Sequence, residues 1–147
     1  MIPENALVLL DTTILVELAR GRTAGEKIDA KYRLRERREK PLISVVTHGE
    51  ILTLARVWNW GAQKVEFVKD LLRELVIVDV SRRPVIERYA EIAAFAKANG
   101  LALSDNDAWI AATAAATDSW LLTEDKDFDS LHGKFIQREW VDLESLK

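Results

Sequence analysis

The segment Leu7-Val-Leu-Leu-Asp-Thr-Thr13 joins a short, fully apolar run to an acid and two hydroxyl residues. An apolar run of this length without polar alternation is typical of a β-strand buried on both faces of a parallel sheet. Apolar residues then recur at helical spacing from Ile14 to Ala19, until Arg20-Gly21 stops the pattern. The segment therefore predicts a buried strand that ends at Asp11 and leads directly into a helix.

The same alternation of strand and helix continues to the end of the chain. Further strands are predicted at Leu42 to Val46, at Leu75 to Val78, at Trp120 to Leu122 and, as an edge strand, within Phe135 to Val141. Helices are predicted from Thr23 to about Glu39, from Thr47 to Trp58, over 62–74, over 84–99 and from Ser104 to Thr117. Short connections between these elements favour right-handed crossovers, and hence an α/β sandwich in which helices cover both faces of a central, mostly parallel sheet.

Length and composition limit the class of protein. The 147 residues, of which 48% are hydrophobic, predict a single domain spanning 1–147. The absence of cysteine excludes disulfides, zinc-thiolate sites and thiol nucleophiles, and agrees with a reducing compartment. The first apolar stretch is cut short by Asp11, and no run approaches the roughly twenty residues of a membrane span. We therefore expect a soluble cytoplasmic protein with no membrane partner.

The charge is unevenly distributed. A net charge of -3 argues against a surface that coats nucleic acid by charge alone, but Lys31 to Lys40 is strongly basic. This stretch could bind RNA phosphates, contact a protein partner or form an ordinary solvated helix face. The sequence leaves these three interpretations open.

Four acids are predicted to meet at one edge of the sheet. Asp11 directly follows the first strand and Asp125 follows the strand of Trp120, whereas Glu50 and Asp107 lie in the first turns of helices. In open parallel α/β sheets, ligands bind beyond the carboxyl ends of the strands. The four carboxylates can therefore converge on one crevice.

Helix capping is the alternative explanation of three of these acids, and Asp125 alone would be a turn residue. Glu50 could form a capping box with Thr47, Asp107 could form one with Ser104, and Asp11 could be an N-cap. Capping explains each acid separately, but not why all of them fall at the same predicted edge. Clustered carboxylates repel one another unless a cation offsets their charge. Hard oxygen ligands favour magnesium, manganese or calcium, so the pattern predicts a site for one or two divalent ions acting on a phosphodiester.

Four segments together resemble a known family. They are Asp11-Thr-Thr-Ile-Leu15, Val46-Thr-His-Gly-Glu-Ile-Leu52, Asp107-Ala-Trp-Ile-Ala-Ala-Thr-Ala114 and Leu122-Thr-Glu-Asp-Lys-Asp-Phe128. Their order and spacing resemble the PIN domain, most closely the VapC-type toxins of toxin-antitoxin pairs, and the resemblance covers nearly the whole chain. It implies a PIN-like three-layer α/β/α sandwich. It further implies a catalytic, metal-binding set with Mg2+ or Mn2+, formed by Asp11, Glu50, Asp107 and Asp125, with Asp127 as a further metal-binding acid.

The resemblance also implies supporting residues and partners. Thr13 and Thr123 match hydroxyl residues that would orient the carboxylates or a water molecule. Members of the family are RNA endonucleases, are commonly homodimers and are silenced by a small VapB-like antitoxin. A homodimer is also favoured by the large apolar residues Trp58, Trp60 and Trp109. The predicted function is therefore that of a metal-dependent endoribonuclease, the toxin of a VapBC-type pair.

Rival interpretations differ in what they require. A haloacid-dehalogenase-like phosphatase needs Asp-x-Asp after the first strand, where this chain has Thr13. A response-regulator receiver needs acids and a lysine in a register that the sequence lacks. A non-catalytic PIN-fold binding module and a DNA-directed or structure-specific nuclease remain as alternatives.

Overall fold

The computed structural model describes all residues 1–147 and contains one five-stranded sheet. The strands lie in the order β3-β2-β1-β4-β5 and every pair of neighbours is parallel. Their bounds are Val8–Leu10 (β1), Leu42–Ser44 (β2), Val76–Val78 (β3), Trp120–Thr123 (β4) and Gln137–Trp140 (β5). The prediction of an α/β fold with a parallel central sheet is confirmed.

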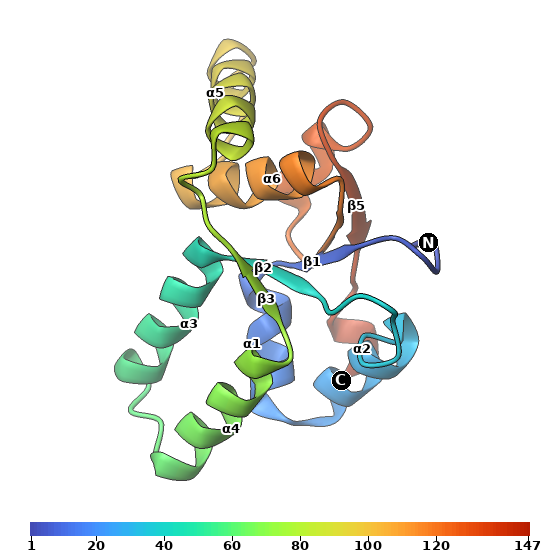
Figure 1. The fold of residues 1–147 in the computed structure, drawn as a ribbon, viewed down its shortest axis with the longest axis vertical. Helices are drawn as coiled ribbons and strands as arrows, with labels where there is room; N and C mark the ends of the chain where they lie inside the picture. Colours follow the sequence, from blue (N-terminus) through green and yellow to red (C-terminus); the bar gives the residue numbers. More distant parts are fainter.

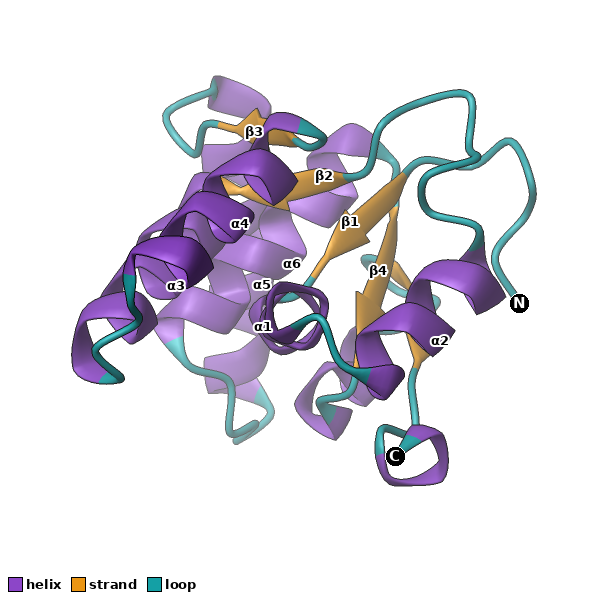
Figure 2. Ribbon diagram, turned by 90° about the horizontal axis from the view of Figure 1, so that it is seen from below, coloured by secondary structure: helices purple, strands orange, loops and turns teal.

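Helices cover both faces of this sheet (Figures 1 and 2). The helices are α1 (Thr12–Arg20), α2 (Thr23–Tyr32), α3 (Val45–Val57), α4 (Ala62–Arg73), α5 (Arg83–Ala98) and α6 (Asp105–Thr117), with two short 3-10 helices, η1 (Lys126–Leu131) and η2 (Glu144–Leu146). Figure 1 shows α5 and α6 on one side of the strands and α1, α3 and α4 on the other. The three predicted layers are therefore present.

The alternation of side chains along the short strands fills two cores. Leu10 and Leu122 pack with Ile14 and Ile28 on the α1–α2 side. Their neighbours Leu9 and Leu121 point to the other face and pack against α5, α6 and η1. Because both faces of β1 and β4 are buried, these strands need no polar alternation, which is why the sequence shows only apolar residues there.

The helix predicted from Thr23 to Glu39 is wrong in its second half. α2 ends at Tyr32, and Arg33 takes a left-handed conformation with φ of 52°. The chain then turns inward, so that Leu34 is buried. Arg37 donates hydrogen bonds to the backbone carbonyls of Tyr32 and Pro3, at 2.9 and 3.1 Å. These contacts with the N-terminal segment stop the helix, and local propensity contains no sign of them.

Two predicted strands differ in detail from the structure. β2 ends at Ser44 rather than Val46, because the Ser44 side chain caps α3 by accepting a hydrogen bond from the Val46 N–H at 3.1 Å. β3 was predicted as a buried strand, yet Val76 and Ile77 are 44% and 41% exposed. β3 is an edge strand and pairs only with β2.

The close packing of α1 on α2 depends on Gly25. A Cβ atom at this position would lie 2.5 Å from the carbonyl oxygen of Glu17 in α1. Only glycine allows this backbone approach, which fixes the turn between the two helices.

None of the helices is both long and apolar enough to cross a membrane.

Candidate metal site

The carboxyl ends of the three central strands bring the predicted acids to one edge of the sheet. Asp11 follows β1, Asp125 lies two residues beyond the end of β4, and Glu50 lies in α3, which starts directly after β2. Asp107 comes from the first turn of α6. Short strands with immediate turns into helices therefore deliver side chains from four different segments to one place.

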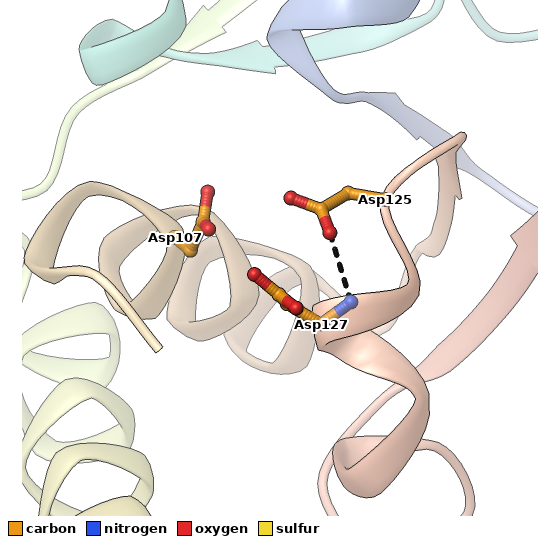
Figure 3. A group of neighbouring side chains, drawn as sticks. All are labelled: Asp107, Asp125 and Asp127. Atoms are coloured by element: carbon orange, nitrogen blue, oxygen red, sulfur yellow. Dashed lines mark hydrogen bonds between the residues drawn. The ribbon is translucent and has the colours of Figure 1, made fainter. Parts of the chain in front are cut away.

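Three of the acids form a tight cluster. Asp107, Asp125 and Asp127 each offer a carboxylate oxygen within 4.8 Å of the other two. Figure 3 shows Asp107 on α6 facing Asp125 and Asp127, which come from the turn after β4 and the start of η1. The Asp127 N–H donates to Asp125 Oδ1 at 2.8 Å, so that Asp125 caps η1. The other carboxylate oxygen of Asp125 does not take part in this capping hydrogen bond.

Asp11 is the most deeply buried of the acids, with 4% of its surface exposed. Its Oδ1 accepts from the Thr12 N–H at 2.7 Å, and its Oδ2 accepts from the Thr123 hydroxyl at 2.6 Å. Burial raises the pKa of Asp11 to about 7, opposed by these two hydrogen bonds and assisted by the negative charges of Asp107 and Asp125. Asp11 is thus an N-cap of α1 and also lies within the field of the acid cluster.

Glu50 does not form the capping box that its position had suggested. The cap of α3 is Ser44, three residues before Thr47. Glu50 Oε1 instead accepts from the Thr12 hydroxyl at 2.6 Å, and Oε2 accepts from the Asn106 side-chain amide at 3.4 Å. The capping interpretation of Glu50 is therefore wrong, and its carboxylate is held from two other helices.

The backbone N–H of Asp107 is capped by Ser104 at 3.1 Å, which confirms that α6 begins there. Burial raises the pKa of the Asp107 carboxyl to about 6, followed by the negative charges of Asp125, Glu50 and Asp127, whereas a hydrogen bond with Ser104 lowers it. All of these carboxylates therefore act on one another electrostatically.

No basic side chain neutralises this site. None of its five carboxylates, those of Asp11, Glu50, Asp107, Asp125 and Asp127, takes part in a salt bridge. Several carboxylates that lack a counter-ion and lie close together are the donor set that Mg2+ or Mn2+ prefers. The residues present therefore fit a divalent cation.

The hydroxyl residues near the acids behave differently from one another. Thr123 is fully buried and accepts from the Asp125 N–H at 2.9 Å while donating to Asp11. The hydroxyl of Thr13, expected to orient a carboxylate or a water, is buried and has no hydrogen-bond partner. Thr12 makes the contact with Glu50 instead. Sequence reasoning missed Thr12 and Asn106; the only available signal was that each directly adjoins one of the predicted acids.

The basic stretch lies away from the acids, and two of its six basic side chains form salt bridges. It precedes the start of β2, whereas the acids follow the ends of the strands. Arg33 pairs with Glu4 and Glu36, and Arg35 pairs with Asp29. Part of the positive charge of this stretch is therefore neutralised by acids of the chain itself, and the stretch does not adjoin the acid site.

The sequence matches the family model of the PIN domain over residues 8–134, so the chain belongs to the PIN domain family. PIN domains are nucleases that use divalent metal ions, and the acid cluster of this chain is consistent with that chemistry. None of the curated proteins matches the sequence.

Solved structures share the fold at low identity. VapBC2 from Rickettsia felis, bound to a DNA fragment from its promoter, superimposes with a TM-score of 0.79 at 20% identity, covering 92% of this chain and 99% of that one. DNA-bound VapBC from Salmonella typhimurium gives 0.74 at 17%, covering 91% and 97%. VapBC-1 from nontypeable Haemophilus influenzae gives 0.73 at 22%, again covering 91% and 97%. The chain thus matches nearly the whole length of each neighbour.

Proposed function

We propose that this PIN domain is a Mg2+- or Mn2+-dependent endoribonuclease whose catalytic centre consists of Asp11, Glu50, Asp107 and Asp125. The observation that carries the proposal is the set of carboxylates without counter-ions at the carboxyl ends of β1, β2 and β4. Burial and like charge raise the pKa of two of them, so the fold keeps them together at an electrostatic cost. Such a cost is removed by a cation.

The residues divide the work of the site among themselves. Asp107, Asp125 and Asp127, whose oxygens lie within 4.8 Å of one another, would hold the cation together with the neighbouring carboxylates of Asp11 and Glu50. A bound divalent ion activates water and stabilises the charge that develops on a phosphodiester. Thr123 keeps the Asp11 carboxylate in a single orientation by donating its hydroxyl proton to Oδ2. We also propose, from the family motif alone, that Thr13 supports the site from outside the set of metal-binding acids.

The biological role that we propose is the toxin of a VapBC-type pair, with RNA as substrate and a small VapB-like protein as antitoxin. Support comes from the segments around the four acids and from the shared fold of VapBC structures from three bacteria. The match covers more than nine-tenths of this chain and of each of those chains.

We also propose that the active form is a homodimer. Apolar side chains are exposed on α3, β3 and α5, namely Leu52, Val57, Ile77 and Ile86. Of the three tryptophans expected at an interface, Trp58 is 45% exposed, whereas Trp60 and Trp109 pack partly against the two cores. Light scattering of the isolated chain at micromolar concentration should give twice the monomer mass. A monomer throughout that range would contradict this proposal.

Cleavage assays test the enzyme directly. The purified chain should cut RNA with Mg2+ or Mn2+ and stop with a chelator. Glu50→Gln and Asp107→Asn should reduce cleavage by orders of magnitude, because each removes a carboxylate while keeping its shape. Asp129→Asn is the matched control, since Asp129 pairs with Arg138 outside the acid set. Full activity in both site variants, or equal cleavage in excess EDTA, would reject the metal mechanism, and preferential cutting of DNA would reject RNA as substrate.

A further inference from the structure

Thr12 connects two of the site's acids. It is the first residue of α1, and its backbone N–H donates to Asp11 Oδ1 at 2.7 Å. Its side-chain hydroxyl lies 2.6 Å from Glu50 Oε1 and 3.1 Å from Thr47 Oγ1. A single residue on the helix after β1 therefore contacts an acid of its own segment and an acid of the neighbouring helix α3.

The direction of these hydrogen bonds follows from counting protons. A hydroxyl has one proton to donate and can accept as well. A carboxylate can only accept, so the Thr12 proton goes to Glu50 at the shorter distance of 2.6 Å. The Thr12 hydroxyl is also the donor toward Thr47 Oγ1, but at 3.1 Å this is the longer contact and takes the smaller share of the same proton. Thr47 is fully buried, which keeps this pair away from competing water.

Glu50 needs such an anchor more than its neighbours do. Its side chain is partly exposed on α3 and forms no salt bridge, and its charge acts on the nearby Asp107. Mutual repulsion favours turning the carboxylate out to water. The only other hydrogen bond of the Glu50 side chain is the longer one with Asn106, at 3.4 Å. The Thr12 hydroxyl is therefore the strongest contact that keeps Glu50 next to the acid cluster.

We propose that Thr12, supported by Thr47, is the positioning residue that holds the Glu50 carboxylate in the cation site. This inference rests on the proposed function, because it assigns to Thr12 a role toward the proposed metal site. Thr12 acts through Glu50 and touches neither substrate nor cation. Thr53 of α3 is the contrast, since its exposed hydroxyl donates only to the backbone carbonyl of Gly49.

Mn2+ affinity of the metal-free protein, measured by calorimetry, tests the proposal without relying on activity. Thr12→Val keeps the branched shape and removes the hydroxyl, and should weaken Mn2+ binding by about 10- to 100-fold, as is typical for loss of a group that orients a ligand. Thr12→Ser should restore parental affinity. Thr53→Val, which removes an exposed hydroxyl of α3 that donates only to the backbone carbonyl of Gly49, should bind Mn2+ as the parent does.

Two further variants separate positioning from damage to the fold. Thr12→Val alone leaves the buried Thr47 hydroxyl without a partner, whereas Thr12→Val/Thr47→Val replaces both groups with apolar side chains of the same shape, which is close to neutral for stability. The double variant should therefore melt like the parent and still bind Mn2+ weakly. In a Glu50→Ala background, Thr12→Val should cause no further loss of affinity.

A folded double variant that binds Mn2+ as tightly as the parent would overturn the proposal. An equal loss of Mn2+ affinity on Thr12→Val in the parent and in the Glu50→Ala background would also overturn it, because Thr12 would then not act through that carboxylate. These outcomes leave the proposed nuclease intact, because the parent still binds Mn2+. A parent that binds no Mn2+ would overturn both.

Discussion

Removing the negative charge of Asp107 should stabilise the metal-free protein, because the fold raises the pKa of this carboxyl from 3.8 to about 6. An acid whose pKa is higher in the folded than in the unfolded state prefers to be protonated when folded. Its stabilising contribution is complete below the unfolded value of 3.8 and is lost as pH rises through about 6. Asp107→Asn mimics the protonated form and should escape this loss.

The size of the effect follows from the two pKa values. The difference of about two units between 3.8 and about 6 corresponds to at most about 3 kcal/mol, at about 1.4 kcal/mol per unit. Asp107 keeps part of its surface in water, and solvent screening reduces the figure to about 1–2 kcal/mol. For a chain of this size, that is a rise in Tm of about 2–8 °C near neutral pH.

The measurement is thermal melting in EDTA at several pH values, comparing the parent with Asp107→Asn. The advantage of the variant should be largest near about pH 8 and should shrink as pH falls from about 6 to about 4. Asp105→Asn is the matched control, because Asp105 lies in the same first turn of α6 but is exposed to solvent. The Asp105→Asn variant loses the same favourable interaction with the helix N-terminus, and its Tm should not rise above that of the parent. A variant that is no more stable than the parent at about pH 8 would refute the electrostatic reasoning.

Two further predictions concern the framework of the domain. Gly25→Ala should lower the free energy of unfolding by about 1–3 kcal/mol, because its Cβ would lie 2.5 Å from a backbone oxygen. Gly49→Ala in α3, whose Cβ would meet nothing within 4 Å, should raise it by about 0.5–1 kcal/mol. Chemical denaturation measures both free energies, and equal effects would contradict the close packing of α1 on α2. Arg37→Met should lose about 1.5–3 kcal/mol with its bonds to backbone carbonyls, while Arg38→Met, at an exposed position, should be neutral in the same assay.

The parts of the fold that depend on local pattern could be predicted from the sequence. The apolar run before Asp11 specifies β1 because both faces of that strand are covered, and Gly21 ends α1 in the left-handed conformation that glycine favours. Ser104 caps α6 where the Ser-x-x-Asp pattern suggested. The gathering of acids also followed from local information, because parallel strands end at the same edge.

Other features depend on contacts between distant segments and left no trace in local sequence. α2 stops early because Arg37 bonds to the N-terminal segment more than thirty residues away in the chain. Glu50 has a capping-box spacing from Thr47, yet its partner is Thr12, 38 residues earlier. β3 has the composition of a buried strand but lies at the sheet edge, because burial depends on neighbours that no window of residues contains.

Capping and cation binding, which the sequence presents as competing explanations of the acids, act together in this site. Asp125 caps η1 through Oδ1 and keeps its other oxygen for the cluster, and Asp107 leaves the capping of α6 to Ser104. The N-termini of α1 and α6 are thereby directed at the crowded carboxylates, and their partial positive charge offsets some of the repulsion. An amide can replace a carboxylate in a cap but cannot supply its charge to a cation. Asn and Gln variants can therefore separate two roles that a single side chain performs.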